Sequence, residues 1–406
     1  MRKDRIALLL GTLLVFFSGI TAPAQHARAA TGTVPYVGFR KQTTAAEFAG
    51  STLTGVIVES RGGGAAISLV PTGLATGTNL KRYGVKSYSY GTLVSPIFDA
   101  ASPFDTAIAS WNALTPSGTW MQIELRAYRP GDRQWTKYYT MGIWASGTTT
   151  IKRQSVAGQG DADGSVATDT LRLRGDQLAT RYQYRLTLFT TGRRLSPTVR
   201  LVSVMTSASS EEARGLDLES DRQVWETELN VPQRSQMIYK GGGEVWCSPT
   251  STSMVLAYWG FPVAVPTAAA ATYDYVYRGN GTWPFNTAWA GTFGLEAYVT
   301  RLSSMAQVEE WISAGVPVIM SYAAGPGELP GTPYTSTRGH IMVIRGFDTQ
   351  GNVIVNDPAG TLDARVRFVY DRSILERLWL THSGGTVYII HPRSLAVPTT
   401  HRNGNW

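Results

Sequence analysis

Cysteine is almost absent from this chain of 406 residues, because Cys247 is the only one. A single cysteine excludes an intramolecular disulfide, so burial of apolar side chains must hold the fold, and the chain is long enough for that. Histidine is also scarce. The five histidines lack metal-ligand spacing and are His26, His340, His382, His391 and His401. We therefore expect neither a metal site nor a cofactor.

Long apolar runs are equally few. The main one, residues 6–20, follows a basic start with Arg2, Lys3 and Arg5 and precedes small residues that include Ala27-Arg28-Ala29. This order is typical of a secretory signal peptide, and the run is too short for a transmembrane helix, which needs about 20 apolar residues. We predict a signal peptide over residues 1–30 and a secreted protein, free or associated with the cell wall, that is not inserted in a membrane after processing. An uncleaved anchor is the less favoured alternative.

Charge is modest and not clustered. Charged residues make up 16% of the chain, and the formal net charge of +8 is spread along it. The sequence therefore gives no reason to expect a nucleic-acid partner, whereas a mild positive charge is compatible with a polyanionic partner such as a cell wall.

Residues 31–207 lack any convincing amphipathic helix. Short alternating runs such as "WMQIELRAY" and "RYQYRLTLFT" are separated by turn clusters such as "RGGG" and "RPGD". This pattern predicts an all-β domain, a sandwich or jelly roll. Its tryptophans could stack on sugars of a cell-wall glycan if exposed, but the favoured interpretation is that they are core residues; they are Trp111, Trp120, Trp135 and Trp144.

Residues 208–224 are polar and dense in charge, and we interpret them as a linker. Residues 225–397 mix helix and strand signals. Helices are predicted over 248–259 with Ser248 as N-cap, over 304–314 and over 371–379, followed or separated by strands such as "HIMVIRGF" and "NVIVND". Strands that are mostly joined by hairpins predict an α+β domain with an antiparallel sheet.

Cys247 lies directly before the predicted helix at 248–259. The N–H groups and the dipole of a helix N-terminus favour an anion, so they favour a thiolate, the reactive form of cysteine. A buried, inert cysteine explains this segment alone equally well. A nucleophilic thiol requires a base, and His340 at the start of a predicted strand is the candidate. His382, after a helix, and His391, before a proline, are poorer candidates.

The group that orients His340 should come from the neighbouring strand of the hairpin. A five-residue loop, 348–352, would place Asn356 on the face of His340, whereas a four-residue loop, 348–351, would place Asp357 there. Either side chain can hold an imidazole, and an aspartate would also stabilise the imidazolium. The sequence leaves both alternatives open.

An oxyanion donor is expected upstream of Cys247. The segment "VPQRSQ" contains Gln233 and Gln236, and a glutamine amide beside the cysteine N–H can bind a developing oxyanion. For either glutamine taken singly, a solvated surface position is the more common role.

The segments "VPQRSQ", "WCSPTSTSMVLAYWG", "GHIMVIRGF" and "VNDPAG", in this order, resemble the cysteine peptidases of family thirty-nine in their secreted form. The resemblance covers about 225–397 and implies a papain-like fold. It implies that Cys247 is the nucleophile, His340 the base, Asp357 the orienting residue and Gln236 the oxyanion donor. The chain departs from the family pattern at Ser248, where glycine is usual, and in a lengthened stretch between Gln236 and Cys247.

Taken together, the sequence predicts a secreted cysteine peptidase that hydrolyses peptides or proteins. Two alternatives stay open: a non-enzymatic surface or glycan-binding protein, and a thiol enzyme that transfers the acyl group to an amine. The loops 279–291 and 323–339 are expected to form the specificity pockets.

Overall fold

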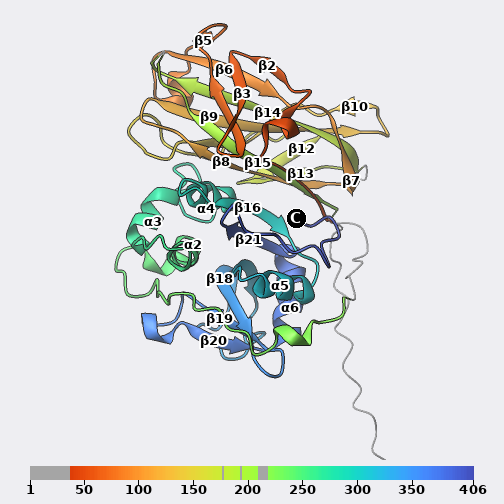
Figure 1. Ribbon diagram of the computed structural model, residues 1–406, viewed down its shortest axis with the longest axis vertical. Helices are drawn as coiled ribbons and strands as arrows, with labels where there is room; N and C mark the ends of the chain where they lie inside the picture. The colour runs from red at the N-terminus through yellow and green to blue at the C-terminus, as the bar shows by residue number, and fades with distance from the viewer. Residues whose placement is uncertain (1–36, 176–177, 193, 209–217) are drawn as a thin grey trace, which may run out of the picture.

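The computed structural model describes residues 37–175, 178–192, 194–208 and 218–406. The predicted signal peptide and most of the predicted linker lie outside the described residues. Two domains follow one another along the chain, and the N-terminal domain lies above the C-terminal domain in Figure 1. Within the described ranges, no helix is both long and apolar enough to cross a membrane.

The N-terminal domain consists of two antiparallel sheets. The seven-stranded sheet has the order β12-β13-β8-β15-β4-β3, with β1 also paired to β15, and the eight-stranded sheet has the order β10-β9-β14-β6-β2, with β11, β5 and β7 paired alongside. The strands of the first sheet are β1 (Val37–Gln42), β3 (Val56–Arg61), β4 (Gly64–Leu69), β8 (Thr106–Leu114), β12 (Gly164–Ala167), β13 (Thr170–Leu173) and β15 (Thr198–Ser207). Those of the second are β2 (Thr52–Thr54), β5 (Ala75–Gly77), β6 (Tyr88–Val94), β7 (Phe98–Phe104), β9 (Thr119–Arg129), β10 (Gln134–Trp135), β11 (Tyr139–Trp144) and β14 (Ala179–Thr190). The predicted β-sheet character of this domain is confirmed, and the jelly-roll alternative stays a prediction.

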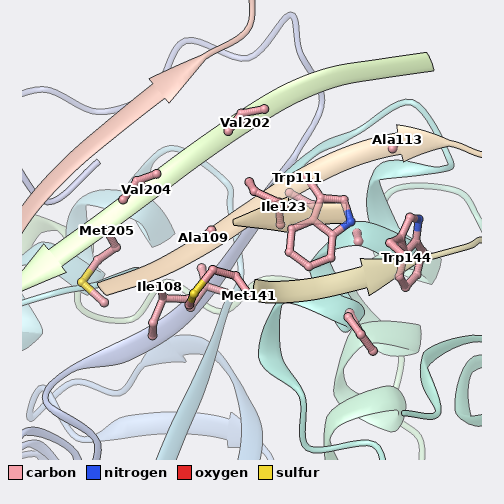
Figure 2. Close-up of a cluster of buried hydrophobic side chains, with 14 of the residues drawn as sticks. Ile108, Ala109, Trp111, Ala113, Ile123, Met141, Trp144, Val202, Val204 and Met205 are labelled. Atoms are coloured by element: carbon pink, nitrogen blue, oxygen red, sulfur yellow. The ribbon is translucent and has the colours of Figure 1, made fainter. Parts of the chain in front are cut away.

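The tryptophans of this domain are mainly core residues. Trp111, Trp120 and Trp144 are fully buried, and Figure 2 shows Trp111 and Trp144 among the apolar side chains of β8, β9, β11 and β15. Trp135 is partly exposed, but the Arg126 guanidinium lies 4.5 Å from the centre of its ring. These three buried rings cannot stack on a sugar. This agrees with the interpretation favoured from the sequence, that the tryptophans are core residues.

The C-terminal domain contains a six-stranded sheet of order β16-β21-β17-β18-β19-β20, antiparallel at every pairing. Its strands are β16 (Glu296–Arg301), β17 (Val318–Ala324), β18 (Thr337–Phe347), β19 (Val353–Asn356), β20 (Arg367–Tyr370) and β21 (Thr386–His391). Its helices are α2 (Cys247–Tyr258), α3 (Val265–Thr272), α4 (Trp283–Gly291), α5 (Met305–Ser313) and α6 (Arg372–Ser383). Helices α2, α3 and α4 lie on one side of the sheet in Figure 1, and α5 and α6 lie on the other. The predicted antiparallel sheet with helices is confirmed.

Local signals explain most of these helix ends. The Ser304 side chain accepts a hydrogen bond from the Gln307 N–H, and the Asp371 side chain accepts one from the Ile374 N–H. The predicted N-cap at Ser248 is wrong, because α2 begins one residue earlier and Ser248 is buried inside its first turn. Helices α3 and α4 and strand β16 were not predicted.

The two domains share one hydrophobic core. Phe285 of α4 packs 6.0 Å from the ring of Trp111 and 5.5 Å from that of Trp144. Strand β16 is the edge of the C-terminal sheet, and side chains of β8 cover it. Asn112 donates to the Ala297 carbonyl at 2.7 Å and accepts from the Ala297 N–H at 3.1 Å. Because an uncovered edge is open to pairing with other chains, the β-domain protects the sheet of its neighbour.

Candidate active site

Cys247 is the first residue of α2 and is half-buried. The first N–H groups of a helix have no partner within the helix, and those of Cys247 and Ser248 have none elsewhere in the described chain. Two side chains fix this helix end. The Ser248 and Tyr388 hydroxyls are 2.9 Å apart, and the Ser251 hydroxyl donates to the Ile341 carbonyl at 3.2 Å. The second bond ties α2 to β18, one residue after His340.

His340 lies on β18 and is buried. Its Nε2 is 2.7 Å from Oδ1 of Asp357, and the ring also forms a side-chain hydrogen bond with Cys247. Because Nε2 faces the carboxylate, Nδ1 is the nitrogen left for the thiol. His340 therefore stands between a thiol and a carboxylate, with both ring nitrogens engaged.

Asp357 is fully buried but well supplied with donors. Besides His340, its carboxylate accepts hydrogen bonds from the Ala359 N–H at 2.9 Å, the Tyr334 hydroxyl at 2.9 Å and the Tyr370 hydroxyl at 3.1 Å. A buried carboxylate is tolerated when hydrogen bonds and an opposite charge replace its lost water. This environment holds Asp357 ionised and fixed in direction.

The register of β18 and β19 explains why Asp357 and not Asn356 faces the histidine. Phe347 pairs with Val353, so the loop has the five residues 348–352. A β-bulge at Arg345 then shifts the pairing, and Asn356 comes to lie opposite Val343. That position is on the face away from His340, so the next residue, Asp357, reaches the His340 face.

Asn356 has a different set of partners from Asp357. It accepts a hydrogen bond from Arg345 at 3.1 Å and donates to the Val231 carbonyl at 3.1 Å. Through Val231 it holds the segment that leads into the C-terminal domain, and it does not hydrogen-bond to the histidine.

The electrostatics follow from this packing. Burial by itself lowers the pKa of His340, but the Asp357 charge, its hydrogen bond and the Cys247 side chain outweigh burial and raise the pKa from 6.5 to about 10. Burial likewise opposes ionisation of Asp357, yet the charge and hydrogen bond of His340 lower the pKa of this carboxyl below its usual value. The imidazole is therefore held in its protonated form near neutral pH.

Gln236 lines the cavity that contains the Cys247 thiol, although ten residues separate the two along the chain. Its side chain is buried and lines the same cavity as Cys247 and His340, and its Oε1 has no hydrogen-bond partner among the described residues. The intervening chain turns back at Gly241 and Gly242, whose φ angles are +83° and +142°. Gly243 then packs against the Gln236 carbonyl, where a Cβ would come within 2.2 Å.

The other predicted candidates lie elsewhere. Gln233 is half-exposed and lines neither of the cavities described below. His382 is exposed near the end of α6. His391 is buried, with Nδ1 2.8 Å from the Pro392 carbonyl and its ring against Trp311. Among the residues that the structure describes, no group of three or more acidic, histidine or cysteine side chains could hold a metal ion.

Two cavities meet at Cys247 and His340. The larger, of about 660 Å³, is lined by Gln236 together with parts of the two predicted specificity loops, such as Asn280 and Tyr334. The smaller, of about 300 Å³, is lined by residues of both domains, including Thr168 and Trp283. An extended polypeptide could therefore pass over the thiol with space on either side.

Sequence reasoning missed the tyrosines that surround the histidine and aspartate. The rings of Tyr334 and His340 are 5.1 Å apart, and burial together with the charge of Asp357 raises the pKa of Tyr334 and that of Tyr370. Tyr334 comes from the loop at 323–339 and Tyr370 from the end of β20. No spacing in the sequence links them to Asp357, so only the folded chain identifies them.

Comparison with known proteins places this site in a family. Residues 228–387 match the Peptidase C39 like family, and residues 38–207 match the Peptidase C39 N-terminal domain. No curated protein sequence matches the chain significantly.

Solved structures give more distant similarities. A C39-like peptidase from Bacillus anthracis is 18% identical over 40% of this chain and 96% of its own, with a TM-score of 0.30. A double glycine motif protease from an AMS/PCAT transporter, solved with a leader peptide, is 20% identical over 41% and 94%, with a TM-score of 0.28. A xylanase 10B fragment from Clostridium thermocellum is 11% identical over 43% and 28%, with a TM-score of 0.20.

The two family matches together cover most of the described chain, and the second contains Cys247, His340 and Asp357. The C-terminal half of the chain belongs to the C39-like peptidase family, as its sequence segments indicated.

Proposed function

We propose that this protein is a cysteine peptidase that hydrolyses peptide bonds. One observation carries the proposal: His340 stands between the Cys247 thiol and the Asp357 carboxylate, at the N-terminus of a helix and at the junction of two cavities. A thiol, a base and a residue that orients the base are the parts that nucleophilic catalysis requires. The family match supports the same chemistry.

In the resting site the thiol proton has already passed to His340, so the reaction starts from the Cys247 thiolate beside a protonated His340. The Cys247 sulfur then bonds to the substrate carbonyl carbon, and the carbonyl electron pair moves to oxygen. The Cys247 N–H and the Gln236 amide are placed to donate to that oxyanion. When the carbon–nitrogen bond breaks, the amine leaves with the proton from His340. Water, losing a proton to His340, then attacks the thioester, and the carboxylic acid leaves while the Cys247 thiolate and the protonated His340 are restored.

The fold that we propose for the C-terminal domain is papain-like. The nucleophile begins a helix on one side, and the base comes from an antiparallel sheet packed against that helix. The contact of α2 with β18 through Ser251 supports this arrangement. We also propose that the protein is secreted, on the basis of the signal peptide predicted over residues 1–30.

Cleavage of a defined peptide library by the full chain tests the proposal. We expect products from the wild type that are absent with Cys247→Ala, and we expect mass spectrometry to show free carboxylates and amines. Equal cleavage by the two proteins would remove the peptidase assignment. Products joined to an added amine would instead indicate acyl transfer.

Two glutamines of one segment provide a matched pair for the oxyanion role. Gln236→Ala should lower kcat by about 100-fold, the typical loss when one oxyanion donor is removed. Gln233→Ala changes a side chain outside both cavities and should leave kcat near the wild-type value. Equal effects of the two substitutions would contradict the assignment of Gln236.

A further inference from the structure

The smaller cavity at Cys247 is built partly by the N-terminal domain. Strands β12 and β13 form a hairpin, and its residues Thr168, Asp169, Thr170 and Arg172 line this cavity together with Cys247 and His340. The hairpin is about 80 residues away from the cysteine along the sequence. The β-domain therefore forms a wall of the site and is more than a neighbouring module.

The hairpin is held in this position by the peptidase domain. Asp169 accepts a hydrogen bond from the Trp283 N–H at 2.6 Å, so it supplies an acceptor for the first N–H of α4, and it accepts another from the Thr170 hydroxyl at 3.0 Å. Nearby, Arg153 of the β-domain donates to the Ala270 carbonyl at 2.9 Å. The bond between Asp169 and Trp283 and the bond between Arg153 and Ala270 cross the domain boundary and fix the wall relative to the thiol.

The backbone at the hairpin tip is strained. Thr168 has a φ angle of +60°, a conformation that a β-branched residue rarely adopts. Strain of this kind persists when the surroundings impose it, and it gathers at binding sites. Thr168 lines the cavity, so the strained residue lies at the site itself.

The free charge of this cavity is positive. Arg172 is exposed, and it has no ion-pair partner in the part of the chain that the structure describes. The carboxylate of Asp169 is already engaged by its two donors, and burial, aided by the charge of Asp274, raises the pKa of Asp169 to about 7. Besides Cys247 and His340, which line both cavities, the larger cavity has one charged side chain of each sign, Glu244 and Arg278.

We propose that the β12–β13 hairpin is part of the substrate-binding site, and that Arg172 is a specificity-determining residue that selects an acidic side chain on one side of the scissile bond. The proposal rests on the proposed peptidase function. A guanidinium that faces a cavity without a carboxylate partner can pair with the carboxylate of Asp or Glu in the substrate.

Cleavage-site profiling of the full chain on a proteome-derived peptide library tests this proposal. The wild type should enrich Asp and Glu at one position beside the cleaved bond, and Arg172→Glu should remove that enrichment and favour Lys or Arg there. For a matched Glu and Gln peptide pair, the wild-type preference in kcat/KM should fall by about fivefold in Arg172→Gln, the scale of an exposed ion pair.

Arg174→Glu is the matched control. It makes the same charge change on the same arm of the hairpin, at an exposed residue that lines neither cavity, and it should keep the wild-type profile. Thermal unfolding of each variant verifies that it is folded. Cleavage that depends on Cys247 but has the same profile in wild type and Arg172→Glu would overturn the role of Arg172 and leave the peptidase function standing. Absence of any Cys247-dependent cleavage would overturn the peptidase function and this proposal with it.

Discussion

At the scale of single residues, the site depends on one buried charged pair. Asp357 and His340 are 2.7 Å apart, and each shifts the pKa of the other toward its charged form. The tyrosine hydroxyls on Asp357 leave its carboxylate little freedom to turn. This arrangement keeps the imidazole protonated and aimed at Cys247, which is the state that a thiolate nucleophile requires.

The pair also makes stability depend on pH. The pKa of His340 in the folded chain lies above its ordinary value, so its contribution is complete below about pH 6.5 and is lost as pH rises through about 10. The pKa of Asp357 is lowered, so its contribution is present above its ordinary value of 3.8 and is lost as pH falls through the folded-state pKa. The pair therefore stabilises the fold most between about pH 3.8 and pH 6.5, where both contributions are present.

Asp357→Asn should remove this dependence. In urea unfolding, the difference in free energy of unfolding between wild type and Asp357→Asn should shrink as pH rises from 6.5 to 10. The exposed residue Asp99 provides the control, and Asp99→Asn should track the wild type at every pH. A difference for Asp357→Asn that stays constant over this range would contradict the account of the ion pair.

Much of this residue set could be predicted, because Cys247 and His340 are recognisable from their local segments. The loop length could not decide between Asn356 and Asp357, because the choice depends on the bulge at Arg345, and only the family resemblance indicated Asp357. Tyr334 and Arg172 were missed because folding alone brings their distant segments to the site.

At the scale of elements, strand β18 is the part that aligns the site. It carries His340, is tied to α2 through Ser251, and contains the bulge that turns Asp357 toward the histidine. Beside the bulge, residues 226–229 pair with the same strand, with the Leu229 N–H 2.7 Å from the Arg345 carbonyl. Strand β19 therefore pairs with β18 on one side of the bulge, and residues 226–229 pair with it on the other.

Gly346→Ala should disturb this support. An added Cβ would lie 2.1 Å from the Thr227 carbonyl oxygen, so the backbone must move, at a cost of about 1 to 3 kcal/mol in free energy of unfolding. Gly339→Ala on the same strand is the control for stability, because its Cβ would meet nothing within 4 Å. Chemical denaturation measures both, and an equal loss for the two variants would argue against a tight junction at Gly346.

Two of the elements that the sequence failed to predict, α4 and β16, share a physical cause. Helix α4 is buried on nearly every side, from Pro284 to Gly291, so it has no polar face and no amphipathic period. Strand β16 is likewise buried on both faces. Helix α6 is only partly buried and keeps its amphipathic period and its Asp371 cap, and it was predicted, although it ends at Ser383 and not at Trp379.

At the scale of the whole molecule, the two domains form one unit around a common core. Phe285 packs against both Trp111 and Trp144, and the Lys41 ammonium lies 2.6 Å from the Glu296 carboxylate across the boundary. The β-domain covers the sheet edge at β16 and supplies a wall of the cavity at Cys247. Dividing the chain into a peptidase and a removable module, as its composition suggests, would break this core.

Phe285→Ala should therefore destabilise both domains together. A cavity of this size costs about 3 to 5 kcal/mol, and tryptophan fluorescence and far-ultraviolet circular dichroism should follow one shared unfolding transition. Leu362→Ala serves as control, because Leu362 is 50% exposed and its loss should cost little. Two separate transitions, with only one moved by Phe285→Ala, would show that the domains unfold independently.

The central claim is that His340 and Asp357 make Cys247 an activated nucleophile, and alkylation by iodoacetamide tests it most directly. Because Cys247 is the only cysteine, the extent of labelling of the whole protein reports on this one thiol. At pH 6 we predict that Cys247 reacts faster than glutathione, and that His340→Ala and Asp357→Asn lose most of this advantage. A wild-type rate no higher than that of glutathione, or rates unchanged by both substitutions, would contradict the account.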